Sequence, residues 1–273
     1  MNYNEIGKTG MRVSNLSFGA SSLGGVFHDI REAEGIKAVY TAVENGMNFI
    51  DVSPYYGHYK AETVLGKALK EIPRDKYYLS TKVGRYGKDG VNTWDYSGKR
   101  ATESVYESLD RLHIEYIDLI NVHDVEFSDM NQVVNETLPA LVELKKKGIV
   151  GHVGITDLQL ENLKWIIDHS EPGTVESVLN FCHYCLNDEK LTDYLDYFES
   201  KNIGIINAPP FQWPYSPNVG SCMASGPPIT GRSLSESCST LPVQKLSYRE
   251  TGYSIFCQQS TYRHHFVQFG QSG

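Results

Sequence analysis

Short apolar blocks alternate with longer blocks of helical periodicity along residues 1–211. The strand-like blocks are Leu16–Gly19, Asn48–Ser53, Tyr77–Val83, Tyr116–His123, Gly151–Thr156, Val175–Tyr184 and Ile203–Ala208. The helix-like blocks between them are Arg31–Asn45, Ala61–Glu71, Ala101–His113, Asn131–Lys147, Leu158–His169 and Asp188–Ser200. Such regular alternation predicts repeated βαβ units and therefore a parallel sheet.

Two parallel architectures fit this alternation. A doubly wound sheet carries Gly-x-Gly-x-x-Gly after its first strand, but here that strand is followed by Ala20-Ser21-Ser22-Leu23-Gly24-Gly25. We therefore predict an α/β fold, a (β/α)8 barrel of TIM type, which is incomplete because seven strands are recognisable. Tyr3–Ile6 and Met11–Ser14 predict a hairpin that precedes the first parallel strand.

The alternation stops after Phe211. Residues 212–273 contain 11 Ser and three of the five Cys, and they show neither strand nor helix periodicity. Four Lys or Arg against two Asp or Glu give this segment +2, which leaves −10 for residues 1–211 in a chain of net charge −8. We therefore divide the chain into a truncated barrel, 1–211, and an irregular or disordered tail, 212–273. Alternative splicing or a frameshift is our interpretation of the abrupt change, and a flexible native tail is the alternative.

The composition is that of an ordinary soluble protein, with 40% hydrophobic and 21% charged residues. A net charge of −8 argues against nucleic acid or an anionic membrane as the main partner. No apolar run approaches the roughly 20 residues of a membrane span, and Met1–Arg12 lacks the apolar part of a signal peptide. With five cysteines in no framework spacing, the sequence predicts a cytoplasmic protein. The oligomeric state stays open.

Four polar residues stand at or just beyond the ends of three consecutive predicted strands. Asp51 lies near the end of the second strand, and Tyr56 follows it in the loop. Lys82 lies near the end of the third strand, and His123 closes the fourth. These side chains should converge, because barrel active sites are built at the carboxyl ends of the strands. A lysine in an apolar strand needs a partner, and Asp51 on the neighbouring strand is the expected one.

This combination suits reversible hydride transfer to a carbonyl. The phenol of Tyr56 would supply the proton that the carbonyl oxygen needs, and a nearby ammonium should lower the phenol pKa from about 10 towards the operating pH. Lys82 would provide that charge and Asp51 would hold Lys82, while His123 would orient the carbonyl oxygen. Packing alone explains this joint placement poorly, so the pattern indicates an enzyme.

Several motifs resemble those of the aldo-keto reductase family. The run Asn48–Gly57, which reads Asn-Phe-Ile-Asp-Val-Ser-Pro-Tyr-Tyr-Gly, is followed by Glu62-Thr63-Val64-Leu65-Gly66, and together they are similar to the family signature. Further similar segments are Thr81–Val83, Asp118–His123 and Gly148–Thr156, so the resemblance covers residues 3 to about 210. Gly19–Gly25 and the long loop Val83–Arg100 most resemble L-galactose dehydrogenase-like members.

The resemblance implies a catalytic tetrad and a cofactor. Asp51, Tyr56, Lys82 and His123 match the tetrad positions, and Tyr55 is the adjacent alternative to Tyr56. NAD or NADP would serve as the cofactor. A sugar, or a small aldehyde or ketone, would be interconverted with its alcohol or lactone.

The segments that would bind the cofactor depart from the family pattern. Thr156-Asp157 stands where the family has Ser-Asn to hold the nicotinamide carboxamide, and Asn207-Ala208 ends the seventh strand near the expected pyrophosphate. We therefore expect Thr156, Asp157, Asn207 and Ala208 to contact the cofactor. The family Gln of the sixth strand is absent around Leu179-Asn180, and residues 212–273 contain no recognisable eighth strand with a phosphate-binding helix.

Other interpretations stay open. The chain could be a cofactor-binding regulatory subunit, or an inactive or unstable truncated isoform, because an open barrel leaves two sheet edges exposed. Trp94 and Tyr96 could line a substrate pocket or pin a surface loop. Cys182 and Cys185 lie three apart on a predicted strand, so their thiols should face opposite sides, and we expect no metal site.

Overall fold

Seven parallel strands form most of one curled sheet. The computed structural model describes residues 1–26, 30–88, 91–185, 188–208, 254–259 and 270–271. The parallel strands follow the order β11-β10-β9-β8-β5-β4-β3. Their bounds are β3 Leu16–Gly19, β4 Phe49–Asp51, β5 Tyr78–Val83, β8 Ile117–Val122, β9 Val150–Asp157, β10 Ser177–Phe181 and β11 Gly204–Ala208. The predicted α/β fold with an incomplete (β/α)8 barrel is confirmed.

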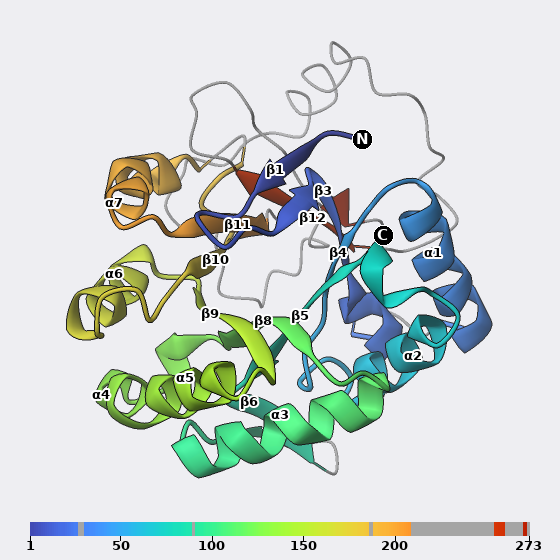
Figure 1. Ribbon diagram of the computed structural model, residues 1–273, viewed down its shortest axis with the longest axis horizontal. Coiled ribbons are helices and arrows are strands. Elements are labelled where there is room, and N and C mark those ends of the chain that lie inside the picture. Colours follow the sequence, from blue (N-terminus) through green and yellow to red (C-terminus); the bar gives the residue numbers. More distant parts are fainter. Residues whose placement is uncertain (27–29, 89–90, 186–187, 209–253, 260–269, 272–273) are drawn as a thin grey trace, which may run out of the picture.

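The helices lie outside this sheet and surround it as an arc (Figure 1). They are α1 Glu32–Glu44, α2 Lys60–Leu69, α3 Gly98–Leu112, α4 Met130–Gln132, α5 Leu138–Lys146, α6 Leu160–His169 and α7 Leu195–Ser200. The predicted continuous helix Asn131–Lys147 is instead interrupted by a π-helical turn at Val133–Thr137. Pro139, near the start of α5, explains the interruption, because it has no N–H to continue the α-helical hydrogen bonds.

The barrel interior and the helix layer have separate hydrophobic cores. The predicted amino-terminal hairpin is present as β1 (Tyr3–Glu5) and β2 (Arg12–Ser14), which pair antiparallel. Its apolar side chains pack on residues that point into the barrel: Ile6, Met11, Val13, Phe49, Leu119, Leu179 and Ile206 form one buried cluster. Two larger clusters fill the space between the strands and the helices. The core thus leaves the opposite, carboxyl end of the strands to polar residues.

One strand from the tail lies between the two edges of the parallel sheet. β12 (Ser254–Gln259) pairs antiparallel with β3 and also with β11, and the short β13 (Gly270–Gln271) pairs with β12. Residues 254–259 therefore differ from the expected irregular tail. The two edge strands carry unpaired N–H and C=O groups, which can pair with a parallel or an antiparallel strand. The regular alternation of strands and helices therefore could not predict β12. The predicted boundary at residue 211 lies outside the described residues.

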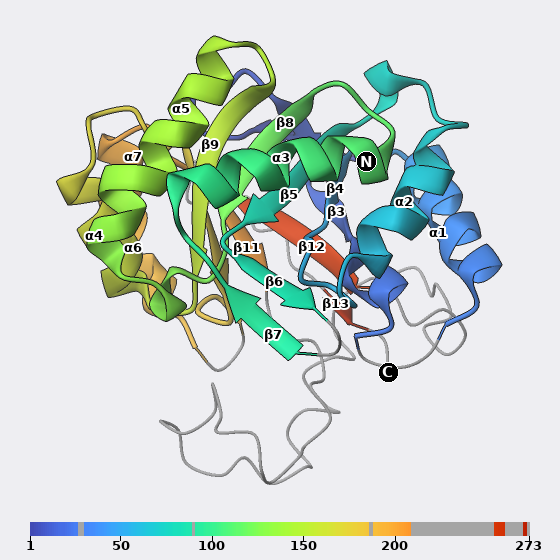
Figure 2. The ribbon, with the colours of Figure 1, turned by 90° about the horizontal axis from the view of Figure 1, so that it is seen from below.

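The loop after β5 contains a second hairpin. β6 (Arg85–Lys88) and β7 (Val91–Trp94) pair antiparallel, where the sequence indicated only a long loop. Figure 2 shows this hairpin beyond the end of β5. Tyr96, just after β7, is buried, and its hydroxyl donates to the carbonyl oxygens of His123 at 2.8 Å and Asp124 at 2.9 Å. Tyr96 therefore fastens the hairpin to the end of β8, and Trp94 remains 42% exposed.

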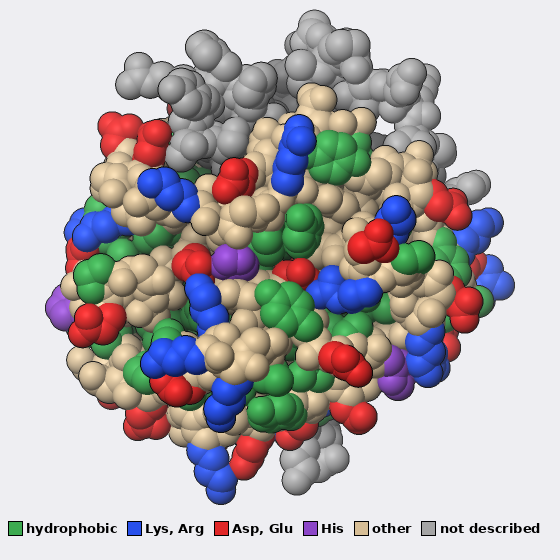
Figure 3. Space-filling model, in the orientation of Figure 1, with side chains coloured by type: hydrophobic (Ala, Val, Ile, Leu, Met, Phe, Trp, Pro, Cys, Tyr) green, Lys and Arg blue, Asp and Glu red, His purple; other side chains and the backbone are tan. Residues whose placement is uncertain are grey.

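Acidic and basic side chains are interspersed on the face that Figure 3 shows, without a broad patch of one sign. Within the described part of the chain, no helix combines the length and the apolar character needed to cross a bilayer.

Candidate active site

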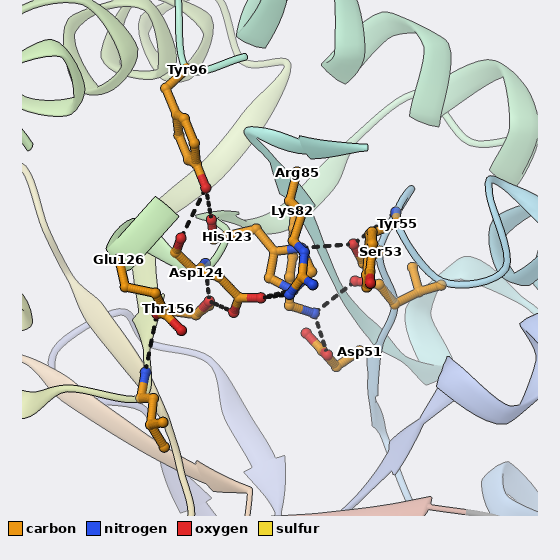
Figure 4. A network of polar contacts seen from close by, with 12 residues as sticks. Asp51, Ser53, Tyr55, Lys82, Arg85, Tyr96, His123, Asp124, Glu126 and Thr156 are labelled. Atoms are coloured by element: carbon orange, nitrogen blue, oxygen red, sulfur yellow. Dashed lines mark hydrogen bonds and ion pairs between the residues drawn. The ribbon is translucent and has the colours of Figure 1, made fainter. Parts of the chain in front are cut away.

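Lys82 and Asp51 form a buried ion pair between neighbouring strands. Lys82 Nζ lies 2.6 Å from Asp51 Oδ2 and also donates to the carbonyl oxygen of Val52 at 2.9 Å. Burial lowers the pKa of Lys82, but Asp51 and Tyr56 together raise it above its ordinary value, so the amine stays charged. The expected pairing of these two residues is present in the structure (Figure 4).

Two further polar residues support Asp51 inside the barrel. Ser80 Oγ donates to Asp51 Oδ1 at 2.7 Å, and Asn121 Nδ2 donates to Ser80 Oγ at 3.0 Å. All three side chains are fully buried. Neither Ser80 nor Asn121 was predicted from the sequence. Each is a polar residue in the middle of an apolar strand. A buried polar side chain needs a hydrogen-bond partner, so this pattern could have indicated both residues.

Tyr56 lies over Lys82 in the loop that follows β4. Lys82 Nζ is 5.0 Å from the centre of the Tyr56 ring. Burial raises the pKa of the Tyr56 phenol to about 12, and Lys82 offsets only part of that rise. The expectation that Lys82 lowers this pKa below its ordinary value is therefore wrong, because loss of hydration outweighs the ammonium. The phenol is neutral at physiological pH, which is the form that donates a proton.

Tyr55, the sequence alternative to Tyr56, faces a different neighbour. The guanidinium carbon of Arg85 lies 3.8 Å from the centre of the Tyr55 ring. Of the two phenols, only Tyr56 has its ring next to the Lys82 ammonium among the described contacts. The geometry thus favours Tyr56 as the proton donor.

Two glycines bring the Tyr56 loop against the segment that follows β3. A Cβ atom on Gly24 would lie 2.5 Å from the carbonyl oxygen of Tyr56, and a Cβ atom on Gly57 would lie 2.1 Å from the carbonyl oxygen of Gly24. Gly57 also has a φ of 62°, which disfavours other residues. Backbone therefore packs directly on backbone at the point where the chain presents Tyr56.

His123 is a neutral imidazole beside Tyr56. The two ring centres are 5.8 Å apart, with the planes at 90°. Burial lowers the pKa of His123 to about 3. The Ser53 hydroxyl lies 3.1 Å from Nδ1, and it accepts a hydrogen bond from the Tyr55 backbone N–H at 3.1 Å. Ser53 can therefore donate to Nδ1, which leaves the proton on Nε2. No role for Ser53 was predicted from the sequence, although it lies in the signature run.

Asp124 connects His123 to the residues expected at the cofactor. Its carboxylate Oδ2 forms an ion pair with Arg85 and lies 3.5 Å from His123 Nε2. Its backbone N–H donates to Thr156 Oγ1 at 2.8 Å, and the Thr156 hydroxyl lies 3.2 Å from Asp124 Oδ1. The Thr156 hydroxyl is therefore engaged within the chain. Neither Arg85 nor Asp124 was selected from the sequence, because ion pairs between loops leave no periodic signal.

The expected cofactor residues lie along one line at the carboxyl ends of β9, β10 and β11. Asp157 is opposite Asn180, and Asn180 is opposite Asn207. The carboxylate of Asp157 accepts from Gln159 N at 2.8 Å and from Asn162 Nδ2 at 3.0 Å, so it holds its own loop. Ala208 ends β11, and its carbonyl oxygen accepts from the backbone of Cys182 at 3.1 Å.

Two asparagines in this line, Asn180 and Asn207, use their amide nitrogens but not their amide oxygens in hydrogen bonds to described residues. Asn180 Nδ2 donates to the carbonyl oxygens of Asp157 and Leu158, and Asn207 Nδ2 donates to that of Tyr184. The Oδ1 atoms of both asparagines are buried and have no hydrogen-bond partner among the described residues. Buried acceptors of this kind suit the amide hydrogens of a nicotinamide carboxamide. Asn180 was not predicted, because the family resemblance implies a glutamine in this region of the sixth strand.

Glu126 adds a second carboxyl group beside Asp157. Burial, with the neighbouring Asp157, raises the pKa of Glu126 to about 9. A protonated Glu126 therefore faces Asp157 at neutral pH.

The Cys182-x-x-Cys185 segment is not part of a strand. β10 ends at Phe181, and Cys182 has a φ of 77°. The Cys185 thiol donates to the carbonyl oxygen of Cys182 at 3.2 Å. The prediction of opposite faces rested on a strand that ends too early. No group of metal-ligating side chains occurs within the described ranges.

Known proteins resemble this chain in sequence and in fold. The chain is 43% identical to an L-galactose dehydrogenase from Arabidopsis thaliana over 225 residues, which cover 82% of this chain and 67% of that protein. It is 35% identical to a D-arabinose 1-dehydrogenase from Saccharomyces cerevisiae over 67% of this chain, and it spans only 56% of that enzyme.

The fold and the sequence motifs point to the same family. An aldo-keto reductase from Bacillus halodurans, solved in its holo form, superposes with a TM-score of 0.67 and 27% identity, over 76% of this chain and 65% of that one. Residues 15–214 match the model of the aldo/keto reductase family. The chain belongs to the aldo/keto reductase family.

Proposed function

We propose that this chain is an NAD(P)-dependent oxidoreductase that interconverts an aldose and its lactone, or a small aldehyde or ketone and its alcohol, in the manner of L-galactose dehydrogenase. The observation that carries the proposal is the buried contact of Asp51, Lys82 and Tyr56 beside neutral His123. The similarity to two sugar dehydrogenases supports an aldose as the substrate.

The four side chains divide the proton chemistry. In the direction of reduction, the neutral Tyr56 phenol donates its proton to the carbonyl oxygen, and the Lys82 ammonium stabilises the phenolate that remains. Asp51 and Ser80 hold Lys82 in place. His123, with its proton on Nε2, donates a hydrogen bond that orients the oxygen. In the direction of oxidation, the phenolate accepts the hydroxyl proton.

NAD(P) supplies or accepts the hydride when it is bound. The carboxamide would be held by the buried Oδ1 atoms of Asn180 and Asn207. Thr156 and Asp157 would shape the same wall through their contacts with Asp124 and Gln159. Ala208 would mark the start of the pyrophosphate side.

Small-molecule substrates are the proposed partners, and the cytoplasm is the proposed location, because five cysteines without framework spacing suit a reducing compartment.

The direct test is oxidation of L-galactose by the purified full chain with NAD⁺ or NADP⁺, followed by the absorbance of the reduced cofactor. We expect turnover that depends on both substrates and falls by about 10²–10⁴-fold in Tyr56→Phe. A folded wild-type chain that turns over no aldose, alcohol or carbonyl with either cofactor would contradict the proposal.

A further inference from the structure

Arg85 is held at the rim of the site by three neighbours. It begins β6, directly after Gly84, whose φ of 98° turns the chain away from β5. Its guanidinium carbon lies 3.8 Å from the centre of the Tyr55 ring and 4.9 Å from that of the Phe127 ring. Its NH1 group forms an ion pair with Asp124. Rings on two sides and a carboxylate on a third leave the guanidinium little freedom, and 18% of the side chain stays exposed.

Asp124 ties the position of Arg85 to the reacting centre. It has a φ of 47°, and its backbone is fixed by hydrogen bonds with Tyr96 and Thr156. The oxygen atom that pairs with Arg85 is the one that lies 3.5 Å from His123 Nε2. The Asp124 carboxylate therefore lies between Arg85 and His123, the imidazole proposed to orient the carbonyl (Figure 4).

The guanidinium has donor capacity left for a ligand. An arginine carries five N–H donors in a planar fork. Only NH1 is engaged by Asp124, Nε is buried without an acceptor among the described residues, and a ligand can reach the 18% of the side chain that stays exposed. Beside it, the Trp94 and Phe127 rings lie 5.6 Å apart, and these side chains are 42% and 49% exposed. Fixed donors next to exposed aromatic rings suit a molecule with hydroxyl groups along one edge and C–H groups across its faces.

We propose that Arg85 is a specificity-determining residue, whose guanidinium donates to a hydroxyl oxygen of an aldose away from the reacting carbon while Trp94 and Phe127 cover a C–H face of the sugar. This inference rests on the proposed function for the identity of the substrate. A site that hydrogen-bonds a hydroxyl selects strongly against analogues that lack it, so Arg85 separates sugars from simple aldehydes.

The experiment compares two substrates in wild type, Arg85→Lys and Arg85→Met. L-galactose carries the hydroxyl groups, and butanal offers only a carbonyl. For both variants we expect the KM for L-galactose to rise by about tenfold or more. Arg85→Lys keeps the charge opposite Asp124, so in this variant kcat should stay within about threefold and kcat/KM for butanal within about twofold. Arg100→Met is the matched control, because Arg100 packs on Tyr86 and pairs with Glu107 on α3. This variant should leave kcat and KM unchanged for both substrates.

Arg85→Lys separates binding from a structural role. A lysine keeps the charge opposite Asp124 but loses Nε and the planar group. Full recovery of L-galactose KM in Arg85→Lys would show that Arg85 only neutralises Asp124, and would overturn the inference. Equal losses with both substrates in Arg85→Lys would overturn it as well.

A binding measurement keeps this test independent of turnover. L-galactose should quench the fluorescence of Trp94 in the full chain with NADH present, and Trp94→Phe identifies that signal. Saturable quenching that Arg85→Met abolishes would support the inference even if the wild type proved inactive and the proposed function failed. Equal quenching in wild type and Arg85→Met, or none in either, would contradict it.

Discussion

The Lys82 ammonium and the Asp51 carboxylate lie 2.6 Å apart with 1% and 0% of their side chains exposed, so each is the other's main compensation for lost water. Removing one partner of such a pair leaves an unpaired buried charge. The pair therefore links the stability of the barrel to its proposed chemistry.

We predict that Lys82→Met lowers both stability and activity. The uncompensated Asp51 carboxylate should cost about 3–5 kcal/mol of unfolding free energy, measured by urea denaturation. The double variant Lys82→Met/Asp51→Leu removes both charges and should recover much of that stability while remaining inactive. Recovery of turnover in the double variant would remove the pair from the mechanism.

We predict that Tyr56→Phe reduces kcat by about 10²–10⁴-fold with little change in cofactor binding, because the proton donor is lost. Tyr55→Phe keeps the ring that packs on Arg85 and should lose less than about tenfold. The two variants are compared by steady-state kinetics and by NADH fluorescence titration. A larger loss of kcat in Tyr55→Phe than in Tyr56→Phe would show that Tyr55 is the proton donor.

The direction of the reaction should determine its pH dependence. Because the pKa of Tyr56 is raised to about 12, the phenol needed for reduction is present throughout the neutral range, and the phenolate needed for oxidation increases with pH. We expect kcat/KM for oxidation to rise by up to about tenfold per pH unit above neutrality while reduction stays flat.

The same pH profile also tests His123. Its pKa is lowered to about 3, so it stays neutral and should add no inflection near the ordinary histidine pKa of about 6.5. An inflection there that disappears in His123→Asn would show that the imidazole titrates during turnover.

The parallel strands and the tetrad positions could be predicted from the sequence, whereas the ion pair at the rim could not. Apolar periodicity located β5 and β8 to within one residue at each end, and it placed Lys82 and His123 at their carboxyl ends. The Arg85–Asp124 pair joins two loops whose approach depends on the β6–β7 hairpin. The raised pKa of Tyr56 could not be predicted from the sequence either, because it depends on how deeply the folded chain buries the phenol.

β12 allows a test of how the sheet is completed. Cys257 is opposite Asn207 in β11 and opposite Leu16 in β3. Proline at this position removes the backbone donor between the two edges, so Cys257→Pro should lower Tm by about 2–8 °C, for roughly 1–2 kcal/mol of lost hydrogen bonding. Cys257→Ala keeps the donor and is the control. Equal melting curves for both variants and the wild type would show that β12 contributes nothing to the fold.

The contact between Gly24 and the Tyr56–Gly57 peptide has a consequence for how this site can diverge. Since no Cβ atom fits on either glycine, any substitution of Gly24 or Gly57 would force the two backbone segments apart. Tyr56 therefore cannot be shifted by small steps from that side. At the rim, Trp94 and Phe127 are 42% and 49% exposed and 18% of the Arg85 side chain is exposed, so side chains of other sizes could extend into solvent there. New substrate preferences should therefore arise by substitution at the rim, while the proposed proton donor Tyr56 keeps its place.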